Sequence, residues 1–249
     1  MRSLDWEPAR TRGWVDRFDA VMDRHVPWRA ELHGTALQLL LEFGATESVV
    51  DLGCGPGVLS RWLADRLPGS RVTGLDSDPV MATLAEAHLR GRAVVREQDL
   101  TAPGWGTVEP EQCSAAVSSS VLHMVDAAGY ALVARELAAA VRPGGLVVDI
   151  DELLPAGPAG RLAAACAALR NRVGDEPGAG ESYQEWLTAL CAEPDLGGAC
   201  AAREERFGGR PDVLPATVEQ RIAALRAAGF AEAAVVERRL DVAVLVAVR

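Results

Sequence analysis

Short apolar runs alternate with amphipathic stretches through the middle of the chain. The apolar runs span residues 47–52, 71–76, 93–100, 114–122 and 146–153. The stretches 58–67, 79–89 and 127–141 lie between them and carry apolar residues at helical spacing. Strands that alternate with helices in this way indicate βαβ units and a parallel sheet. Runs that are apolar on both faces belong in the centre of such a sheet, under helices.

The rhythm changes at both ends of this core. Before residue 44, a helical stripe of apolar and aromatic side chains is interrupted at Pro27, and its members are Trp14, Phe18, Val21, Met22 and His25. Between residues 155 and 215, Pro- and Gly-rich segments surround two helical pieces, 160–173 and 182–192, which predicts an inserted helical lid.

The C-terminal segment returns to the pattern of the core. Residues 216–230 predict a helix that ends at Gly229, and residues 231–249 predict two strands with a bend near Leu240. We therefore expect one domain over residues 1–249. Its parts are a helical cap (1–43), a core (44–154), a lid (155–215) and a terminal helix with two strands (216–249).

Composition narrows the choice of ligand. The 249 residues carry a net charge of −10 and contain no Lys, so a nucleic acid is an unfavourable partner and a small molecule is expected. The Ala-, Arg- and Gly-rich composition suits a GC-rich bacterial source. The charged N-terminus and the absence of an apolar run of about 20 residues predict a soluble, intracellular protein with no membrane partner.

The cysteines give no sign of a disulfide framework or a zinc site. They are scattered, odd in number and form no Cys-x-x-Cys pair, at Cys54, Cys113, Cys166, Cys191 and Cys200. We expect reduced thiols and a cytoplasmic location.

A glycine turn follows the first strand, in the sequence VVDLGCGPG at residues 49–57. The glycines fall at positions 53, 55 and 57, and Val58 occupies the third glycine position of a dinucleotide fingerprint, which weakens an NAD-binding interpretation. A sharp turn after a strand ending in Asp51 suits a ligand without a pyrophosphate. Asp76 ends the second strand 19 positions after Gly57, where a carboxylate can accept both hydroxyls of a ribose.

Taken in order, these segments resemble class I S-adenosylmethionine-dependent methyltransferases over nearly the whole chain. The resemblance rests on VVDLGCGPG, RVTGLDSDPVM, REQDL, AAVSSSVLHMV, LAAAVRPGGLVVDIDEL and the C-terminal LRAAGFAEAAVVERRLDVAVLVAVR. It implies an α/β fold with a doubly wound, Rossmann-like, seven-stranded sheet, mostly parallel with an antiparallel terminal hairpin. It also implies S-adenosyl-L-methionine as the cofactor.

The resemblance assigns cofactor contacts residue by residue. It places the backbone of Gly53, Gly55 and Gly57 under the methionine portion, and Asp99 at the adenine amino group with Leu100 beside it. The remaining contacts are Ser77 and Met81 around the adenosine, and Ser118 near the methionine end through its backbone. Asp51 either contacts the methionine ammonium or only organises the turn.

Catalysis by methyl transfer depends mainly on positioning, and a base is required only where the acceptor loses a proton. His123 follows the fourth strand and is the candidate base, with a structural or cofactor-side role as the alternative; His25 and His33 are expected to be structural or rim residues. The candidate substrate contacts are Trp14, Phe18, Tyr183, Trp186 and Arg206, with core packing as the alternative for Trp186.

Three acids cluster at the end of the fifth strand, Asp149, Asp151 and Glu152. A magnesium site would need carboxylates from a second loop, and the fourth strand offers serines there, so we expect no metal. We expect these acids to line the substrate mouth or to cap the following helix.

Several functions remain open at this point. The leading hypothesis is methylation of an uncharged or aromatic small molecule on O, N or C, in secondary metabolism. The alternatives are RNA modification, a repurposed member acting as an activator subunit or cyclase, and an NAD-dependent oxidoreductase. The chain is expected to be a monomer or a homodimer.

Overall fold

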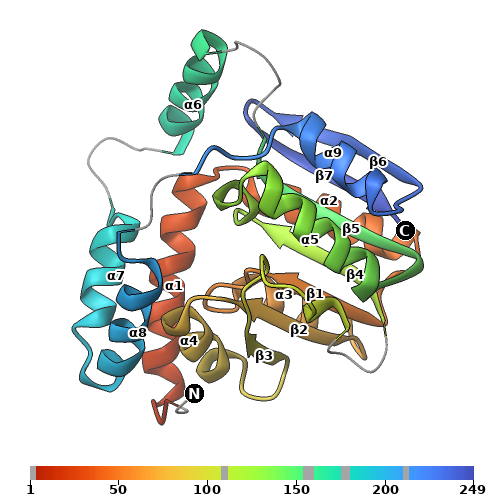
Figure 1. Cartoon of the computed structure of the whole chain (residues 1–249). Coiled ribbons are helices and arrows are strands. Elements are labelled where there is room, and N and C mark those ends of the chain that lie inside the picture. The colour runs from red at the N-terminus through yellow and green to blue at the C-terminus, as the bar shows by residue number, and fades with distance from the viewer. Residues whose placement is uncertain (1–3, 108–111, 154–159, 175–179, 210–212) are drawn as a thin grey trace.

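The computed structural model describes residues 4–107, 112–153, 160–174, 180–209 and 213–249. Its centre is a seven-stranded sheet with the order β3-β2-β1-β4-β5-β7-β6 (Figure 1). The strands are β1 (Ser48–Leu52), β2 (Arg71–Asp76), β3 (Val94–Glu97), β4 (Cys113–Ser119), β5 (Val141–Glu152), β6 (Glu232–Arg239) and β7 (Val242–Val248). Strands β1 to β5 pair in parallel, whereas β7 is antiparallel to both β5 and β6. The predicted fold class is confirmed.

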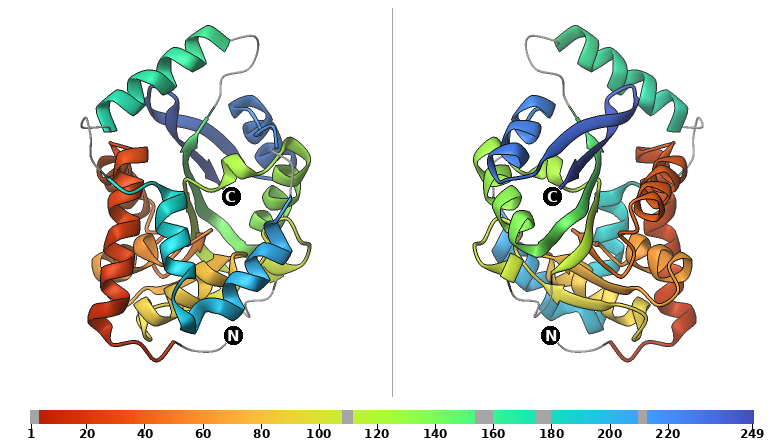
Figure 2. Two further views of the ribbon diagram at one scale, coloured as in Figure 1. Left: turned by 90° about the vertical axis from the view of Figure 1, so that its left-hand side faces the viewer. Right: turned by 90° about the vertical axis from the view of Figure 1, so that its right-hand side faces the viewer.

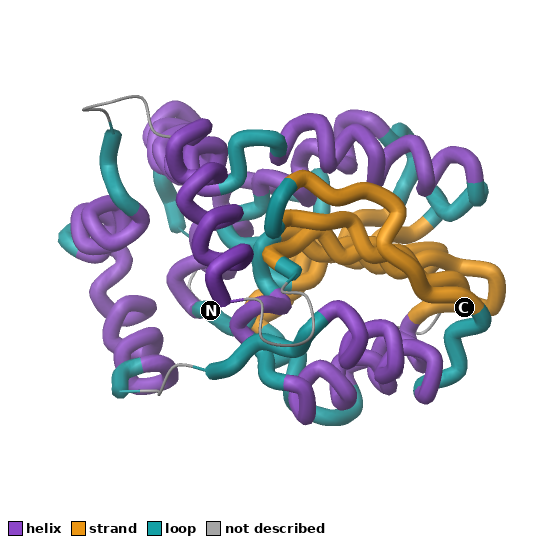
Figure 3. Tube along the Cα trace, turned by 90° about the horizontal axis from the view of Figure 1, so that it is seen from above, coloured by secondary structure: helices purple, strands orange, loops and turns teal. Residues whose placement is uncertain are grey.

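Helices cover both faces of the sheet, as Figure 3 shows from above. On one face, Val49, Ala115 and Leu146 pack with α2 (Arg29–Glu42) and α3 (Val58–Arg66). The next residue of β1, Val50, points to the other face, where α5 (Ala127–Ala140) and α9 (Val218–Ala227) pack. Successive side chains of a strand point to opposite faces, so the continuous apolar runs of the sequence fill two cores.

A third group of helices packs beside the sheet. It consists of α1 (Pro8–His25), α7 (Tyr183–Cys191) and α8 (Gly197–Phe207), which pack with α4 (Pro79–Leu89) (Figures 1 and 2). Their shared core contains Trp14, Leu84 and Trp186. Helix α1 of the cap and helices α7 and α8 of the lid thus form one helical layer, although they are far apart in the sequence. Helix α6 (Gly160–Gly174) lies away from α7 and α8 in Figure 1 but packs against α1.

Most predicted elements match, with differences at their ends. The break at Pro27 separates α1 from α2, and the C-terminal hairpin turns between β6 and β7. The Pro-Gly-Gly stretch at 143–145 lies inside β5, where the pairing with β4 shifts register between Cys113 and Ala115. The Pro- and Gly-rich segments predicted at the lid lie partly outside the described residues, at 155–159, 175–179 and 210–212. The division into cap, core and lid stays a prediction.

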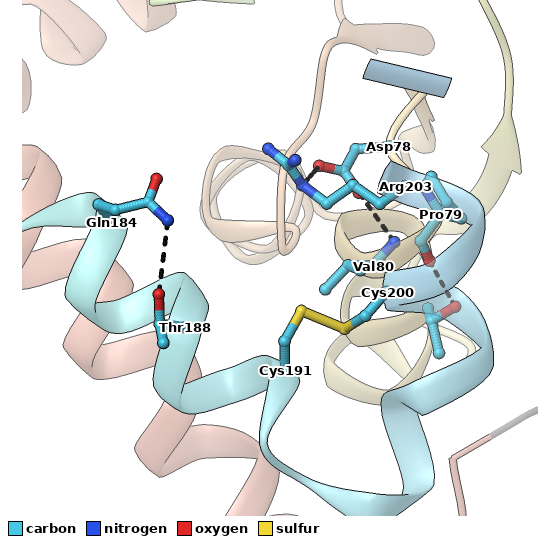
Figure 4. The surroundings of a disulfide bond; sticks show 9 residues. Asp78, Pro79, Val80, Gln184, Thr188, Cys191, Cys200 and Arg203 are labelled. Atoms are coloured by element: carbon cyan, nitrogen blue, oxygen red, sulfur yellow. Dashed lines mark hydrogen bonds and ion pairs between the residues drawn. A yellow bond between two sulfur atoms is a disulfide. The ribbon is translucent and has the colours of Figure 1, made fainter. Parts of the chain in front are cut away.

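The prediction that all cysteines are reduced is wrong for one pair. Cys191 ends α7 and Cys200 lies in α8, and their sulfur atoms are bonded, as Figure 4 shows. The short 3-10 turn Pro194–Leu196 reverses the chain between the two helices and brings the Cα atoms to 5.9 Å. A separation of nine residues follows no short Cys motif, so no local pattern predicts the bond. Reduced thiols therefore no longer support a cytoplasmic location.

Within the described ranges, no helix is both long and apolar enough to span a bilayer.

Candidate functional site

The glycine turn after β1 is built from backbone conformations that favour glycine. Gly53 has a φ of 67°, and a Cβ atom there would lie 2.4 Å from a methyl carbon of Val121. The amides of Gly53 and Cys54 both donate to the carbonyl of Leu75, at 2.7 and 2.9 Å. The turn is therefore fixed between β1 and β2 and leaves open backbone above the sheet.

A cavity of about 860 Å³ lies over this turn. Strand order reverses between β1 and β4, and in open α/β sheets ligands bind at the carboxyl ends of the strands beside that point. The volume lies near the upper end of the usual range for small-molecule sites, so it can hold two ligands side by side. Eight of the predicted site residues line it: Phe18, Gly53, Gly55, Asp76, Ser77, Met81, His123 and Tyr183.

Asp76 is the central acid of the cavity. One carboxylate oxygen accepts the Gly55 amide at 2.8 Å, and the other accepts the Asp78 amide at 2.8 Å. Burial raises the pKa of Asp76 to about 6, and the two amide hydrogen bonds oppose that rise. The side chain still lines the cavity, so its remaining lone pairs can accept hydroxyl donors from a ligand.

Asp51 lies below the turn and is buried. Its carboxylate accepts the hydroxyl of Ser60 at 2.6 Å, which ties the end of β1 to α3. Burial raises the pKa of Asp51 to about 7. Among the described residues around the cavity, Asp51 and Ser118 are not part of the lining. The geometry favours the second of the two expectations for Asp51, organising the turn.

The predicted adenine contacts lie at the margin. Asp99 is exposed and accepts the amide and the hydroxyl of Thr101 at 2.8 and 2.7 Å. Leu100 packs in the core, and its carbonyl accepts the indole N–H of Trp105. Both follow β3, next to the end of the strand that pairs with β2.

Both candidate tryptophans are buried in the helical layer, which for Trp186 is the expected alternative of core packing. Trp186 is fully buried and its indole N–H donates to the carbonyl of Trp14 at 3.0 Å. The Trp14 indole N–H donates to Glu193 at 3.2 Å. The described lining of the cavity includes Phe18 and Tyr183. The tryptophans therefore pack behind the cavity wall, and the smaller rings of Phe18 and Tyr183 form its surface.

Arginines of α8 fasten the lid to the loop after β2. Arg203 contacts the carboxylate of Asp78 at 2.7 Å, as drawn in Figure 4. Arg206 donates to the carbonyl of Ser77 and pairs with Glu97 at 2.6 Å, so its described contacts are to this loop and to β3. Arg203 and Asp78 were missed, because nothing in the local sequence links residues 125 positions apart.

His123 lies opposite the glycine turn, in the 3-10 turn Leu122–Met124 after β4. Its Nδ1 is 2.7 Å from Oδ1 of Asp151. Because an ionised carboxylate can only accept, Nδ1 carries the proton and donates. Burial lowers the pKa of His123, but the hydrogen bond and charge of Asp151 outweigh this and raise it above its usual value.

His33 and His25 lie at structural and rim positions, as expected. His33 is buried, its Nε2 is 2.9 Å from the hydroxyl of Ser119, and burial lowers its pKa to about 3. His25 is exposed at the rim of the cavity and pairs with Glu152 at 3.0 Å.

The prediction for the acids of β5 is wrong for Asp149 and Asp151. Both are fully buried and contact Arg221 of α9, rather than lining the mouth or capping a helix. Their side chains lie two residues apart on one face of the strand, which faces α9. In the described part of the chain, no group of three acids, histidines or cysteines is arranged to hold a metal ion.

Comparisons with known proteins agree with this site. Residues 49–145 match a family model described as "Methyltransferase domain". A trans-aconitate 2-methyltransferase from Paracidovorax citrulli is 32% identical over 174 residues, which cover 69% of this chain and 60% of that protein. A ubiquinone biosynthesis O-methyltransferase from a Methylobacterium species is 36% identical over 145 residues, 57% of this chain and 55% of that one. The chain thus spans about 60% or less of the length of these relatives.

Solved structures share the fold at low sequence identity. DesVI of Streptomyces venezuelae has a TM-score of 0.59 at 16% identity, covering 98% of this chain and 99% of its own. A magnesium protoporphyrin IX methyltransferase from Synechocystis, solved with bound S-adenosylhomocysteine, has a TM-score of 0.54 at 18% identity over 93% and 86% of the two chains. The glycine turn and the Asp76 carboxylate supply the open backbone and the acceptor that such a cofactor needs. The chain belongs to the class I S-adenosylmethionine-dependent methyltransferases, and its cofactor is S-adenosyl-L-methionine.

Proposed function

We propose that this protein transfers the methyl group of its cofactor to a hydroxyl oxygen of a small, largely apolar acceptor. The observation that carries the proposal is that one cavity is lined both by the glycine turn with Asp76 and by His123, whose imidazole is held by Asp151. We assign the part beside the glycine turn and Asp76 to the cofactor (the cofactor end) and the part beside His123 to the acceptor (the acceptor end). When bound, the cofactor supplies a methyl group on a sulfonium, which is already an activated leaving group.

The cofactor end divides between side chains and backbone. We assign the ribose hydroxyls to Asp76, the adenosine to Ser77 and Met81, and the methionine portion to the turn at residues 53–57. Asp99 and Leu100 keep their proposed place at the adenine, since they follow β3 at the edge of the site. Ser118 and Asp51 support the turn from below.

The acceptor end has apolar and polar walls. Its apolar side chains come from α1 and from the loop after β4, and they are Phe18, Val21, Met22, Val121 and Met124; Arg24, His25, Ser119 and Ser120 of the same region add polar groups. Tyr183 of the lid adds a second ring, 6.4 Å from that of Phe18. These side chains suit an aromatic acceptor, and a phenol meets the requirement for both an apolar body and an ionisable oxygen. An acceptor from secondary metabolism would have this character.

His123 takes the role of general base in this proposal. With its Nδ1 proton donated to Asp151, the lone pair of Nε2 is free to accept the proton of the acceptor hydroxyl. The walls hold the acceptor oxygen in line with the methyl group, and this positioning supplies the larger part of the rate.

A second candidate is methylation of a carboxylate, which needs no base. Arg24 lines the cavity and donates to the carbonyl of Glu181, so its charge faces the acceptor end. Several of the relatives, the Paracidovorax citrulli protein among them, are named as methyltransferases of trans-aconitate, which is an acid. The two candidates differ in their dependence on His123.

The test begins with calorimetry of S-adenosylmethionine, S-adenosylhomocysteine and NADH. The first two are expected to bind and NADH is not. Release of S-adenosylhomocysteine is then measured with catechol, phenol and trans-aconitate as acceptors. The proposal expects turnover with a phenol and a loss of about 10² to 10⁴-fold in His123→Gln.

Each other outcome selects an alternative. Turnover of trans-aconitate that survives His123→Gln would favour the carboxylate candidate. Cofactor binding without turnover of any acceptor would favour a repurposed member of the family.

A further inference from the structure

A buried group of charged side chains lies directly behind His123. Arg221 of α9 is fully buried, and its Nη1 lies 2.7 Å from Oδ2 of Asp149 and 3.1 Å from Oδ2 of Asp151. The other oxygen of Asp151, Oδ1, accepts from Nδ1 of His123 at 2.7 Å and from the Glu152 amide at 2.9 Å. Asp151 therefore bridges the guanidinium to the imidazole.

The charges of this group are unequal until His123 is protonated. One guanidinium faces two carboxylates, all three fully buried. An uncompensated charge in such a site is costly, because little water reaches it. A proton on His123 brings two positive charges against two negative ones. The group is thus most stable when the imidazole holds a proton.

The pKa directions agree with this balance. Burial raises the pKa of Asp149 to about 6, and the charge of Arg221 opposes the rise. The carboxylates outweigh burial at Arg221 and raise its pKa, so the guanidinium stays charged. The groups that face His123 are Asp151 and Glu152 of β5, which raise its pKa, and Arg221 of α9, which lowers it. Glu152 is itself paired with His25 and with Arg170 of α6.

A merely structural ion pair would need one carboxylate for the guanidinium. Asp149 alone fills that role, at 2.7 Å. The second carboxylate, that of Asp151, adds an excess negative charge at a buried position. Its other oxygen accepts a hydrogen bond from a histidine that lines the cavity. This arrangement suits a histidine that gains and loses a proton.

We propose that Asp151 is a positioning residue that aims Nε2 of His123 into the cavity, and that Arg221 with Asp149 sets how strongly the imidazole holds the proton it receives. This inference rests on the function proposed above. In the reaction, the acceptor oxygen forms a bond to the methyl carbon, and the carbon–sulfur bond breaks with its electron pair on sulfur. The hydroxyl proton passes to Nε2 of His123, and the net charge of His123, Asp151, Asp149 and Arg221 together becomes zero. An acceptor hydroxyl is therefore the matching chemistry, because a carboxylate has no proton to give.

The experiment is an NMR titration of the imidazole of His123 in the full chain without ligands. The resonance is assigned by its loss in His123→Gln, and His33, with a pKa of about 3, is silent over the same range. Asp151→Asn removes the charge and keeps the shape of the side chain. Asp78→Asn is the matched control, since Asp78 is also a buried acid paired with an arginine, Arg203, at 2.7 Å, and neither of them is among the groups that face His123.

The wild-type midpoint is expected above the ordinary value of about 6.5. Asp151→Asn should lower it by about one to three pH units, the usual effect of removing a close opposite charge, and Asp78→Asn should leave it in place. An unchanged midpoint in Asp151→Asn, or equal shifts in both variants, overturns the proposal. If Asp151→Asn does not fold, Asp149→Asn replaces it, with a smaller fall expected and an unchanged midpoint again decisive.

This readout needs neither an acceptor nor turnover. Failure of the function proposed above would appear as absent cofactor binding or absent methyl transfer. Failure of the present inference would appear as an unmoved imidazole midpoint.

Discussion

Asp76→Ala tests the cofactor end of the cavity most directly. The carboxylate is placed to accept both ribose hydroxyls, and each hydrogen bond to a charged group contributes about 1.5 to 3 kcal/mol. Losing both gives roughly 3 to 6 kcal/mol, or about 10² to 10⁴-fold in affinity at about 1.4 kcal/mol for each factor of ten. The substitution also removes the acceptor that holds the Gly55 amide at 2.8 Å, so the turn itself loosens.

The assay is titration calorimetry with S-adenosylhomocysteine, because the product cannot react during the measurement. Asp126→Ala is the matched control: Asp126 caps α5 by accepting the Gly129 amide at 2.8 Å, as Asp78 caps α4. It tests whether the loss of a helix-end aspartate is enough to weaken binding. An affinity for Asp76→Ala within a few fold of wild type would refute the assignment of the ribose to this side chain.

Three further predictions follow from the same geometry. Burial raises the pKa of Asp76 to about 6, and hydroxyl donors favour its ionised form. The affinity for S-adenosylhomocysteine should therefore be constant above that pH and fall below it by up to about tenfold per pH unit. Calorimetry at pH 5 and pH 8 checks this. Gly53→Ala combines a φ of 67° with a Cβ atom 2.4 Å from a valine methyl, so urea unfolding should show a loss of about 2 to 4 kcal/mol, against about 1 for Gly44→Ala, whose φ is 60° in open space. The disulfide between Cys191 and Cys200 joins residues nine positions apart, and replacing both with Ser should lower the free energy of unfolding by about 2.5 kcal/mol. A wild-type protein whose free energy of unfolding is the same with and without reductant would contradict this.

The sheet was predictable because its signals are local. Each strand is a short apolar run with its own turn signal, and each helix between strands has an amphipathic period. The glycine turn was predictable for the same reason, since the three glycines at 53, 55 and 57 occupy one continuous stretch. Asp76 follows from strand order, because the ends of parallel strands meet at one edge of the sheet.

The helical layer was only half predictable. Its helices appear in the sequence as aromatic stripes, but a stripe does not say which side chains face a ligand and which face another helix. Trp14 and Trp186 carry the largest apolar surfaces, and large rings are most stable where they can be buried completely with their N–H groups paired. The structure buries both and leaves Phe18 and Tyr183 at the cavity.

Arg221 shows where a stronger argument from the sequence was available. Asp149 and Asp151 lie on one face of a central strand, and side chains of a central strand are buried. Two buried carboxylates require a cation, and in a chain without Lys that cation is an arginine or a protonated histidine. A buried arginine interrupts the apolar stripe of the helix that packs on that strand, as Arg221 does between Val218 and Leu225 of α9. The charge balance of a central strand therefore predicts a buried arginine on the helix that packs against it. Hydrophobic periodicity alone assigns such an arginine to the solvent-facing side of the helix.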